Sequence, residues 1–409
     1  MHRCGSAYTI NMRASWTDAL PVLRQRVPAL AEQLTAILST AAASGTTCLH
    51  EAAACGTHLD AQGWTARPPW DILLSGPGAP PPLDEAEPGL FRHGWQQPAA
   101  LVLHTAHRAR EVMPPLPEAE QALLRSQSGP HAAAWLIAIP TDPGTTLSPE
   151  EMQVALRRRL RLPLPLASRH CGGERRYGCG APLDPFGDHA TACHRTGLLA
   201  RRAKVVELAW LRVAREAVGA EGRVIAQPLL GDTNIPGVSC SDQRRLDIVI
   251  YGADPHGVAL CGDATLVAPL NRRGQPTHGS ATRDGAALEA AERRKHRAYP
   301  ELLRGGPQRL LVLGAETGGR WSRDCFSLMR ILLTARSRRT PSLVRRAMCS
   351  GWQRRWWALL ACAVQRAVAM SATSAPWAST PPTPATPPCP LAILSLADFA
   401  GPSRLGFPA

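Results

Sequence analysis

Residues 245–251, Arg-Leu-Asp-Ile-Val-Ile-Tyr, and residues 260–266, Leu-Cys-Gly-Asp-Ala-Thr-Leu, decide the fold of this chain. Both are short runs rich in apolar residues, a pattern typical of β-strands. Each run carries one aspartate, Asp247 in the first and Asp263 in the second. An acid inside an apolar strand costs free energy unless it is paired or used, so both aspartates are candidate functional residues.

Side chains on a strand alternate between its two faces. Asp247 and Val249 are therefore expected on one face of the first strand, and its other face should carry Leu246, Ile248 and Ile250. In the second strand the same period places Asp263 and Thr265 together. If the strands are neighbours, the two carboxylates meet and can bind a hard divalent ion, Mg2+ or Mn2+. Mg2+ held in this way activates water and polarises a phosphodiester.

A lysine follows in the next expected helix, residues 285–299. Lys204 and Lys295 are the only lysines among the 46 basic residues. Arginine stays charged at any working pH, whereas lysine can lose its proton and act at a reacting centre. Lys295 shares a helix face with Ala291 and Tyr299, from which its amine could stabilise charge on a phosphate or orient the attacking water. A coding bias toward arginine also explains why lysines are rare.

Glu207, in the helix expected before the sheet, could add a carboxylate that binds the metal or lies beside it. Each of these residues also has a purely structural interpretation. The aspartates can satisfy turns or pair with Arg244 or Arg245, Glu207 can pair with an arginine, and Lys295 can be a solvated helix residue. The order of two aspartates followed by a lysine favours a functional site over these structural interpretations.

The segments around these strands alternate between helical and extended patterns. The expected helices are 201–218, 285–299 and 322–336, and the expected strands are 223–230, 246–251, 258–267 and 309–313. This order of one helix, three strands, a helix, a strand and a helix predicts an α/β sandwich with a small sheet.

A Cys/His cluster precedes the first of these helices. Its spacing is C-x7-C-x9-H-x3-C, formed by Cys171, Cys179, His189 and Cys193, with glycines between them. Three thiolates and one imidazole suit structural zinc. His170 and His194 flank the cluster and could replace a ligand, and four unrelated free side chains in a glycine-rich loop are the alternative.

The N-terminal region is expected to be helical. Helical patterns cover 18–39, 48–57, 96–112, 117–126 and 150–160, with a Pro/Gly-rich connector at 68–88 and a run predicted to be buried at 132–139. A second group with ligand chemistry, Cys48, His50, Cys55 and His58, lies in an Ala-rich helical context, where such matches are mostly accidental.

The C-terminal region divides in two. Residues 342–369 form a basic, helical segment that contains Trp352, Trp356 and Trp357. Residues 371–390 are rich in Pro, Ser and Thr and are expected to be disordered.

The whole-chain composition favours an anionic partner, because the formal net charge is +14 and the basic residues are almost all arginine. Nucleic acid is the first expectation. The chain has no apolar run of about 18 residues and no hydrophobic signal core, so we expect no membrane association. Twelve cysteines that are scattered apart from the Cys/His cluster do not suggest a disulfide framework. We expect a soluble intracellular protein that is located in the nucleus.

Residues 157–319 resemble the C-terminal region of open reading frames of retrotransposons that lack long terminal repeats, where a zinc knuckle precedes a restriction-like endonuclease of the PD-(D/E)xK superfamily. The likeness rests on four motifs: Cys179-Gly180-Ala181-Pro182-Leu183-Asp184 with Gly187-Asp188-His189 and Cys193; Arg245-Leu246-Asp247-Ile248-Val249-Ile250; Gly262-Asp263-Ala264-Thr265; and Arg294-Lys295 with Tyr299. The runs 130–140 and 160–163 also look like the linker that precedes the nuclease in such elements.

The resemblance implies a restriction-endonuclease-like α/β/α sandwich that cleaves DNA with Mg2+, and it gives Asp247 and Asp263 the two acidic positions. Leu246 stands where proline is common, and Thr265 stands where lysine often follows the second acid. In retroelement nucleases that lysine is commonly displaced to the next helix, and Lys295 fits this placement.

The resemblance and the composition together divide the chain. We expect a helical N-terminal and linker region at 1–165, a zinc knuckle at 166–198, the endonuclease at 199–338, a basic helical extension at 339–370 and a disordered tail at 371–409. No polymerase signature of paired aspartates is present, so we expect a fragment or relic of a longer element whose polymerase part could be a partner. The alternatives are an inactive zinc-dependent module that binds DNA or RNA, and an unstable remnant.

Overall fold

The computed structural model describes residues 19–20, 22–43, 104–166, 170–172, 178–196, 198–233, 235–304 and 306–373. The second Cys/His group, the helix expected at 48–57, the 68–88 connector and most of the C-terminal tail lie outside these residues. No helix in the described part is both long and apolar enough to cross a membrane.

A four-stranded mixed sheet lies at the centre of the described chain, with the order β1-β2-β3-β4. Its strands are β1 (Arg223–Ala226), β2 (Ile248–Tyr251), β3 (Ala259–Val267) and β4 (Gln308–Glu316). β1, β2 and β3 pair antiparallel, whereas β4 pairs parallel to β3. A parallel pair needs a crossover, and α11 (Ala286–Ala298) provides it. The predicted strands and their small mixed sheet are confirmed.

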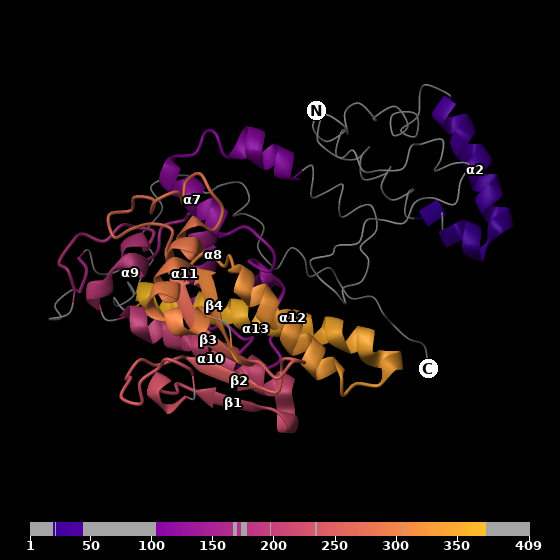
Figure 1. The fold of residues 1–409 in the computed structure, drawn as a ribbon. Coiled ribbons are helices and arrows are strands. Elements are labelled where there is room, and N and C mark those ends of the chain that lie inside the picture. The colour runs from indigo at the N-terminus through magenta and orange to yellow at the C-terminus, as the bar shows by residue number, and fades with distance from the viewer. Residues whose placement is uncertain are drawn as a thin grey trace, which may run out of the picture.

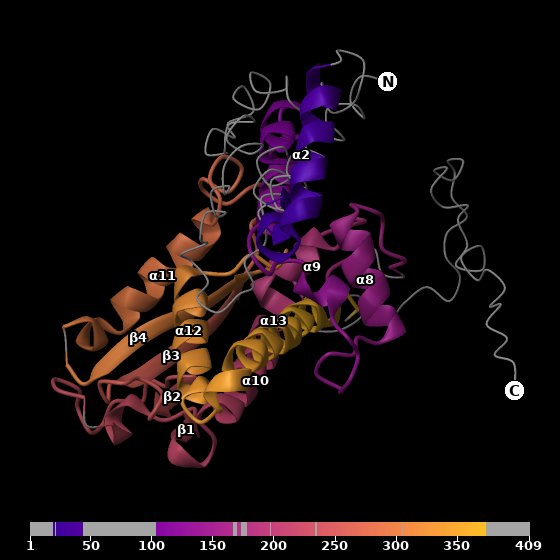
Figure 2. The same cartoon turned by 90° about the vertical axis from the view of Figure 1, so that its right-hand side faces the viewer.

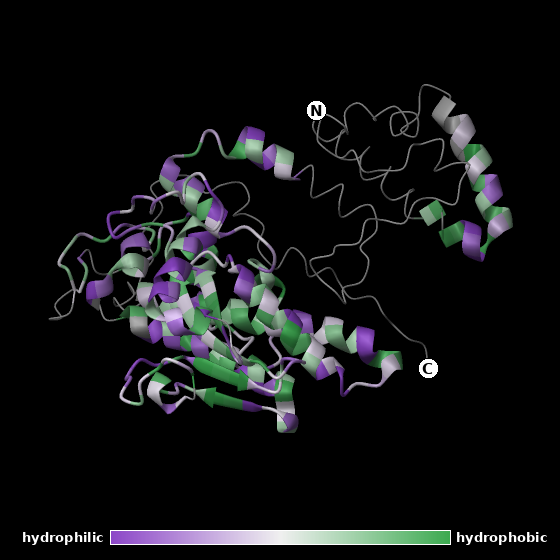
Figure 3. Ribbon diagram, in the orientation of Figure 1, coloured by the Kyte–Doolittle hydropathy of each residue, from purple (hydrophilic) through white to green (hydrophobic). Residues whose placement is uncertain are grey.

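Helices cover both faces of the sheet (Figures 1 and 2). α11 lies on one face, over a cluster that includes Val249, Cys261 and Val312. The other face is covered by α10 (Leu198–Val218) and α12 (Arg323–Ser337), and α13 (Ser342–Thr373) packs on these two helices. The strands are mostly hydrophobic, whereas the helices mix hydrophobic and hydrophilic residues (Figure 3). α10 and α12 bury their apolar sides against the sheet, whereas α13 is buried at nearly every position from Trp356 to Ala369.

The larger core is built around tryptophans. Trp210 of α10 meets Trp321 and Trp357 edge-on, with ring centroids 6.3 and 6.4 Å apart. Trp135, from the segment before the Cys/His cluster, is buried in the same core. This core takes residues from both sides of the predicted boundaries at 198/199 and 338/339. The helix predicted at 342–369 is confirmed, and it packs within the core along α10.

Helices also form in the N-terminal segments that the structure describes. They are α2 (Pro28–Ala43), a π-helical turn (Arg108–Val112), α7 (Glu118–Ser126), a 3-10 turn (Ala134–Ile137) and α8 (Pro149–Arg159). A capping box starts α8, because Ser148 Oγ accepts from the Glu151 backbone N–H and the Glu151 carboxylate accepts from the Ser148 N–H. The run at 132–139 is buried only in part: Ile137 is 81% exposed and Ile139 is 73% exposed. A short 3-10 turn buries only one side, which holds Trp135.

Candidate functional site

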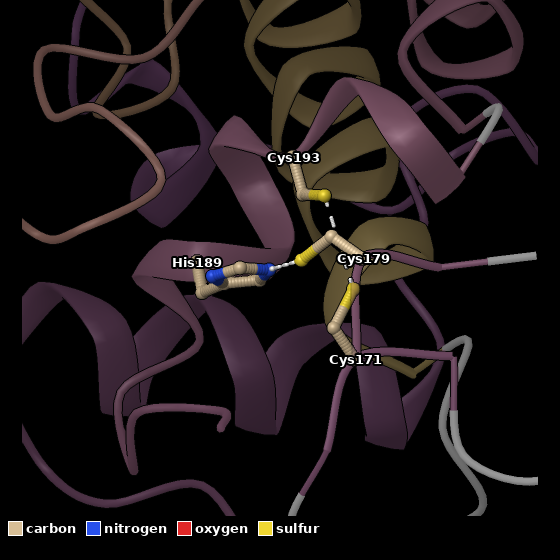
Figure 4. A group of neighbouring side chains, drawn as sticks. All are labelled: Cys171, Cys179, His189 and Cys193. Carbon is tan, nitrogen blue, oxygen red and sulfur yellow. Dashed lines mark hydrogen bonds between the residues drawn. The ribbon is translucent and has the colours of Figure 1, made fainter. Parts of the chain in front are cut away.

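The four predicted ligands of the Cys/His cluster come together. The ligand atoms of Cys171, Cys179, His189 and Cys193 all lie within 4.8 Å of one another. Their side chains point toward one another from the loop that carries Cys171 and Cys179 and from the short helix α9 (Asp188–Ala192) and its end (Figure 4). Cys171 and Cys193 are buried. This group could bind a metal such as zinc.

The spacing within the cluster fits zinc. The Sγ atoms of Cys171 and Cys193 are 3.8 Å apart, and Cys179 Sγ lies 3.2 Å from His189 Nε2. Two sulfurs bound tetrahedrally to one zinc at about 2.3 Å lie about 3.8 Å apart, whereas disulfide sulfurs lie about 2.05 Å apart. Burial raises the pKa of the Cys171 thiol to about 11, and a bound cation would offset that cost to the thiolate.

Local backbone geometry aims these ligands. The carboxylate of Asp184 accepts hydrogen bonds from the backbone N–H groups of Phe186, Asp188 and His189, which fixes the start of α9. Gly187, just before the helix, has a φ of 75°, a value that favours glycine. His189 Nδ1 lies 2.8 Å from the backbone oxygen of Arg272. Donation from Nδ1 to that oxygen leaves the Nε2 lone pair facing the thiols, as in other metal-bound histidines.

Arginines tie the cluster to the rest of the molecule. Arg158 and Arg161 both pair with the buried Asp188, at 3.3 and 2.6 Å. The buried Arg202 of α10 donates to the backbone oxygens of Thr191 in α9 and Leu266 in β3. His170 and His194 are exposed and stand outside the four-residue group.

The two predicted aspartates lie opposite each other. Ile248 pairs with Gly262 in the β2–β3 ladder, and continuing this register by one residue sets Asp247 opposite Asp263. Asp263 is 2% exposed, and its Oδ1 lies 2.7 Å from Lys295 Nζ on α11. Asp247 Oδ2 accepts a hydrogen bond of 2.7 Å from the Ala264 backbone N–H. The structure thus brings Asp247, Asp263 and Lys295 together.

The predicted alternation fails at the start of β2. Leu246 packs in the same apolar cluster as Val249, although the strict period placed the two on opposite faces. Asp247 lies in a bend before the strand, and Gln227, whose N–H donates to the Asp247 backbone oxygen, has a φ of 51°. This left-handed residue twists the pair of chains, which ends the regular alternation one residue before β2.

Glu207 approaches the aspartates from α10. It is 4% exposed, and its Oε1 lies 2.7 Å from Lys204 Nζ. Gln227 Nε2 donates to Glu207 Oε2 at 3.4 Å. The roles of Lys204 and Gln227 were missed in the sequence, although the spacing of Lys204 and Glu207 at i and i+3 on a helix was a usable signal.

Negative charge exceeds positive charge in the carboxylate cluster, defined as Asp247, Asp263 and Glu207. Burial, with the charges of Asp263 and Glu207, raises the pKa of Asp247 to about 7, against the opposing effects of the Ala264 N–H and Lys295. Asp263 Oδ1 is buried without a directed hydrogen bond, although Lys295 is close to it. Three acids facing two lysines fit a further cation.

The carboxylate cluster is looser than the Cys/His cluster. Within the described ranges, the Cys/His cluster is the one group of three or more Cys, His, Asp or Glu ligands gathered within 4.8 Å.

Tyr299 was expected on the same helix face as Lys295, and its hydroxyl donates to the Arg245 backbone oxygen at 2.8 Å. Burial and the nearby carboxylates raise the pKa of Tyr299, so its hydroxyl stays protonated and holds the chain next to Asp247.

No protein-family model and no curated protein matches this chain. The two clusters described above are therefore the basis on which a function is assigned.

Proposed function

We propose that this chain is a metal-dependent DNA endonuclease of the restriction-like class, stabilised by a zinc ion in the Cys/His cluster. The observation that carries the proposal is the meeting of Asp247, Asp263 and Lys295 at neighbouring strands and the helix that follows them. The resemblance described from the sequence supports the same class. The net charge of +14 suits a polyanionic substrate.

Asp247 and Asp263 would hold the divalent ion, which supplies a Lewis acid for the phosphate and acidifies bound water. Lys295 Nζ, beside Asp263, is positioned to stabilise negative charge that develops on the phosphate. Burial and the neighbouring carboxylates hold the pKa of Asp247 near 7, so a cation that binds there would displace the proton that Asp247 still carries at neutral pH. Glu207, held by Lys204 and Gln227, adds negative charge that favours cation binding.

A nicking assay tests this proposal. The zinc-loaded full chain should convert supercoiled plasmid to nicked circles with Mg2+ or Mn2+. Asp263→Asn and Lys295→Met should each slow nicking by about a hundredfold or more, because each removes a charge that acts on the transition state. Glu292→Gln is the matched control on α11, because Glu292 is partly exposed and pairs only weakly with His296.

The second candidate is a zinc-dependent nucleic-acid-binding module that does not cut. Its specific support is the direct ion pair between Lys295 and Asp263, which neutralises the buried acid without any metal. This module would bind DNA or RNA with a steep salt dependence, and Asp263→Asn would leave that binding unchanged. Wild-type binding without nicking favours the module, and nicking that persists in both Asp263→Asn and Lys295→Met contradicts the nuclease.

A further inference from the structure

A small pocket lies between the Cys/His cluster and the N-terminal helices, apart from the carboxylate cluster. α7, α8, α9, α13 and the turn after β4 contribute to it, and its lining includes Arg158, Arg159, Arg161, Trp135, Asp188 and Thr317. Three arginines and one aspartate therefore face the same space. The function proposed above uses none of these side chains.

Several donors at this pocket have no acceptor. Arg159 is half-buried, and within the described residues it has neither an ion pair nor a hydrogen bond to its guanidinium. The Arg161 Nε and Trp135 Nε1 groups are buried and also lack partners there. A buried N–H without an acceptor is destabilising, so these donors favour a ligand that accepts hydrogen bonds.

Positive charge is in excess around the pocket. Arg158 and Arg161 share a single carboxylate, that of Asp188. The buried Arg202 donates to two backbone oxygens, that of Thr191 in α9 and that of Leu266 in β3. Arg161 is held in place by a left-handed backbone with φ 56° and by the Phe186 ring, whose centroid lies 3.9 Å from its guanidinium carbon. Arginines fixed in this way suit a tetrahedral oxyanion, because their planar forks bind two oxygens at once.

We propose that this arginine pocket binds a backbone phosphate of the DNA, an inference that rests on the proposed function and names a second contact with the same substrate. Its position fits this role. Thr317 at the pocket donates its backbone N–H to the Val267 oxygen at 2.9 Å. Val267 is four residues beyond Asp263 on β3, or about 13 Å at about 3.3 Å per residue. Phosphates along one strand of a duplex advance about 3.4 Å per base pair, so a duplex that reaches the carboxylates extends over this end of β3 within a few base pairs.

The test is DNA binding by the zinc-loaded full chain without Mg2+, so that cleavage does not enter. Arg159→Gln should weaken binding to a duplex oligonucleotide by about tenfold and lower the slope of log K against log salt by about 0.9, the loss of one phosphate contact. The matched control is Arg157→Gln, which makes the same charge change two residues away, where Arg157 donates to the Pro163 oxygen instead of lining the pocket. This control should change the affinity much less than Arg159→Gln.

The outcomes separate this proposal from the nuclease. Equal losses of DNA affinity in Arg159→Gln and Arg157→Gln would mean that DNA binds to a diffuse basic surface, and this would overturn the proposal of a phosphate site in the pocket. Inorganic phosphate, compared with chloride at equal ionic strength, is a second probe. If it stabilises the wild type but not Arg159→Gln while DNA affinity is the same in both, the occupant is a free oxyanion and the DNA assignment fails. Failure of nicking alone leaves these binding results unaffected.

Discussion

Glu316 is an acid buried at the end of β4, away from both clusters. It is 3% exposed, and burial, with a smaller effect of Asp284, raises its pKa to about 7, while Ser126 and Arg320 oppose the rise. The folded state therefore holds this proton more tightly than the unfolded state does. The resulting stability is fully present below about pH 4.5 and is lost as the pH rises through 7.

Glu316→Gln should remove this loss, because glutamine stays neutral. We expect the free energy of unfolding of the wild type to fall relative to that of the variant by on the order of 3 kcal/mol between pH 4.5 and 8. Urea unfolding across that range measures it. Glu118→Gln, at an exposed position on α7, is the control and should keep the wild-type pH dependence. Parallel pH profiles for the wild type and Glu316→Gln would contradict the prediction.

At the scale of single residues, the sequence predicted the candidate sites where their chemistry depends on residue type and spacing. The four Cys/His residues and the Asp247, Asp263 and Lys295 set were predicted together and lie together. The Arg272 backbone oxygen next to His189 was not predicted, because any residue offers a carbonyl and its position depends on a loop far along the chain. The left-handed backbone of Gln227 was not predicted either, because glutamine has no preference for positive φ.

The short helix α9 is the element that depends most on the Cys/His cluster. It has five residues, too few to be stable alone, and its two ends carry His189 and Cys193. Zinc would join these ends to Cys171 and Cys179 in the preceding loop. The stability of this element should therefore follow metal occupancy.

Cys193→Ser should lower the zinc content of the purified protein from about one ion to near zero and lower Tm by about 5–10 °C. Zinc analysis and thermal unfolding of the same samples measure both effects. Cys240→Ser is the control, since Cys240 is exposed and outside the cluster, and it should match the wild type in both. Zinc retained in full by Cys193→Ser would refute the ligand assignment.

At the scale of elements, the types of helix and strand were predictable and their ends less so. β4 was predicted from the apolar run at 309–313. It extends to Glu316 because its last residues pair with β3. The first strand ends at Ala226 instead of residue 230, where the chain turns at Gln227. The ends of a strand depend on the strand it pairs with, and the hydrophobic periodicity within one segment does not contain this information.

At the scale of the whole molecule, α13 completes the core. Trp357 is 1% exposed, stacks on His131 with ring centroids 4.6 Å apart, and lies 5.3 Å from Trp321. The sequence predicted this segment as a basic helical extension that contains tryptophans, outside the endonuclease domain. Burial of Trp356 and Trp357 depends on the facing surfaces of other helices, which the local pattern does not contain.

Trp357→Ala should destabilise the fold by about 3–5 kcal/mol, since it leaves a large cavity between helices and the sheet. Denaturant unfolding measures the change. Leu343→Ala on the same helix is the control, because Leu343 is 97% exposed and its loss should cost less than about 0.5 kcal/mol. Similar midpoints for the two variants would show that α13 is not part of the core.

The place of α13 in the core has a consequence for synthesis on the ribosome. The last strand ends at Glu316, so all four strands are translated before Trp357. At about 5–20 residues per second, the 41 residues from 316 to 357 take roughly 2–8 s. During this interval Trp210 and Trp321 lack their final partner, so the nascent chain presents an aromatic surface that chaperones would recognise before the domain closes.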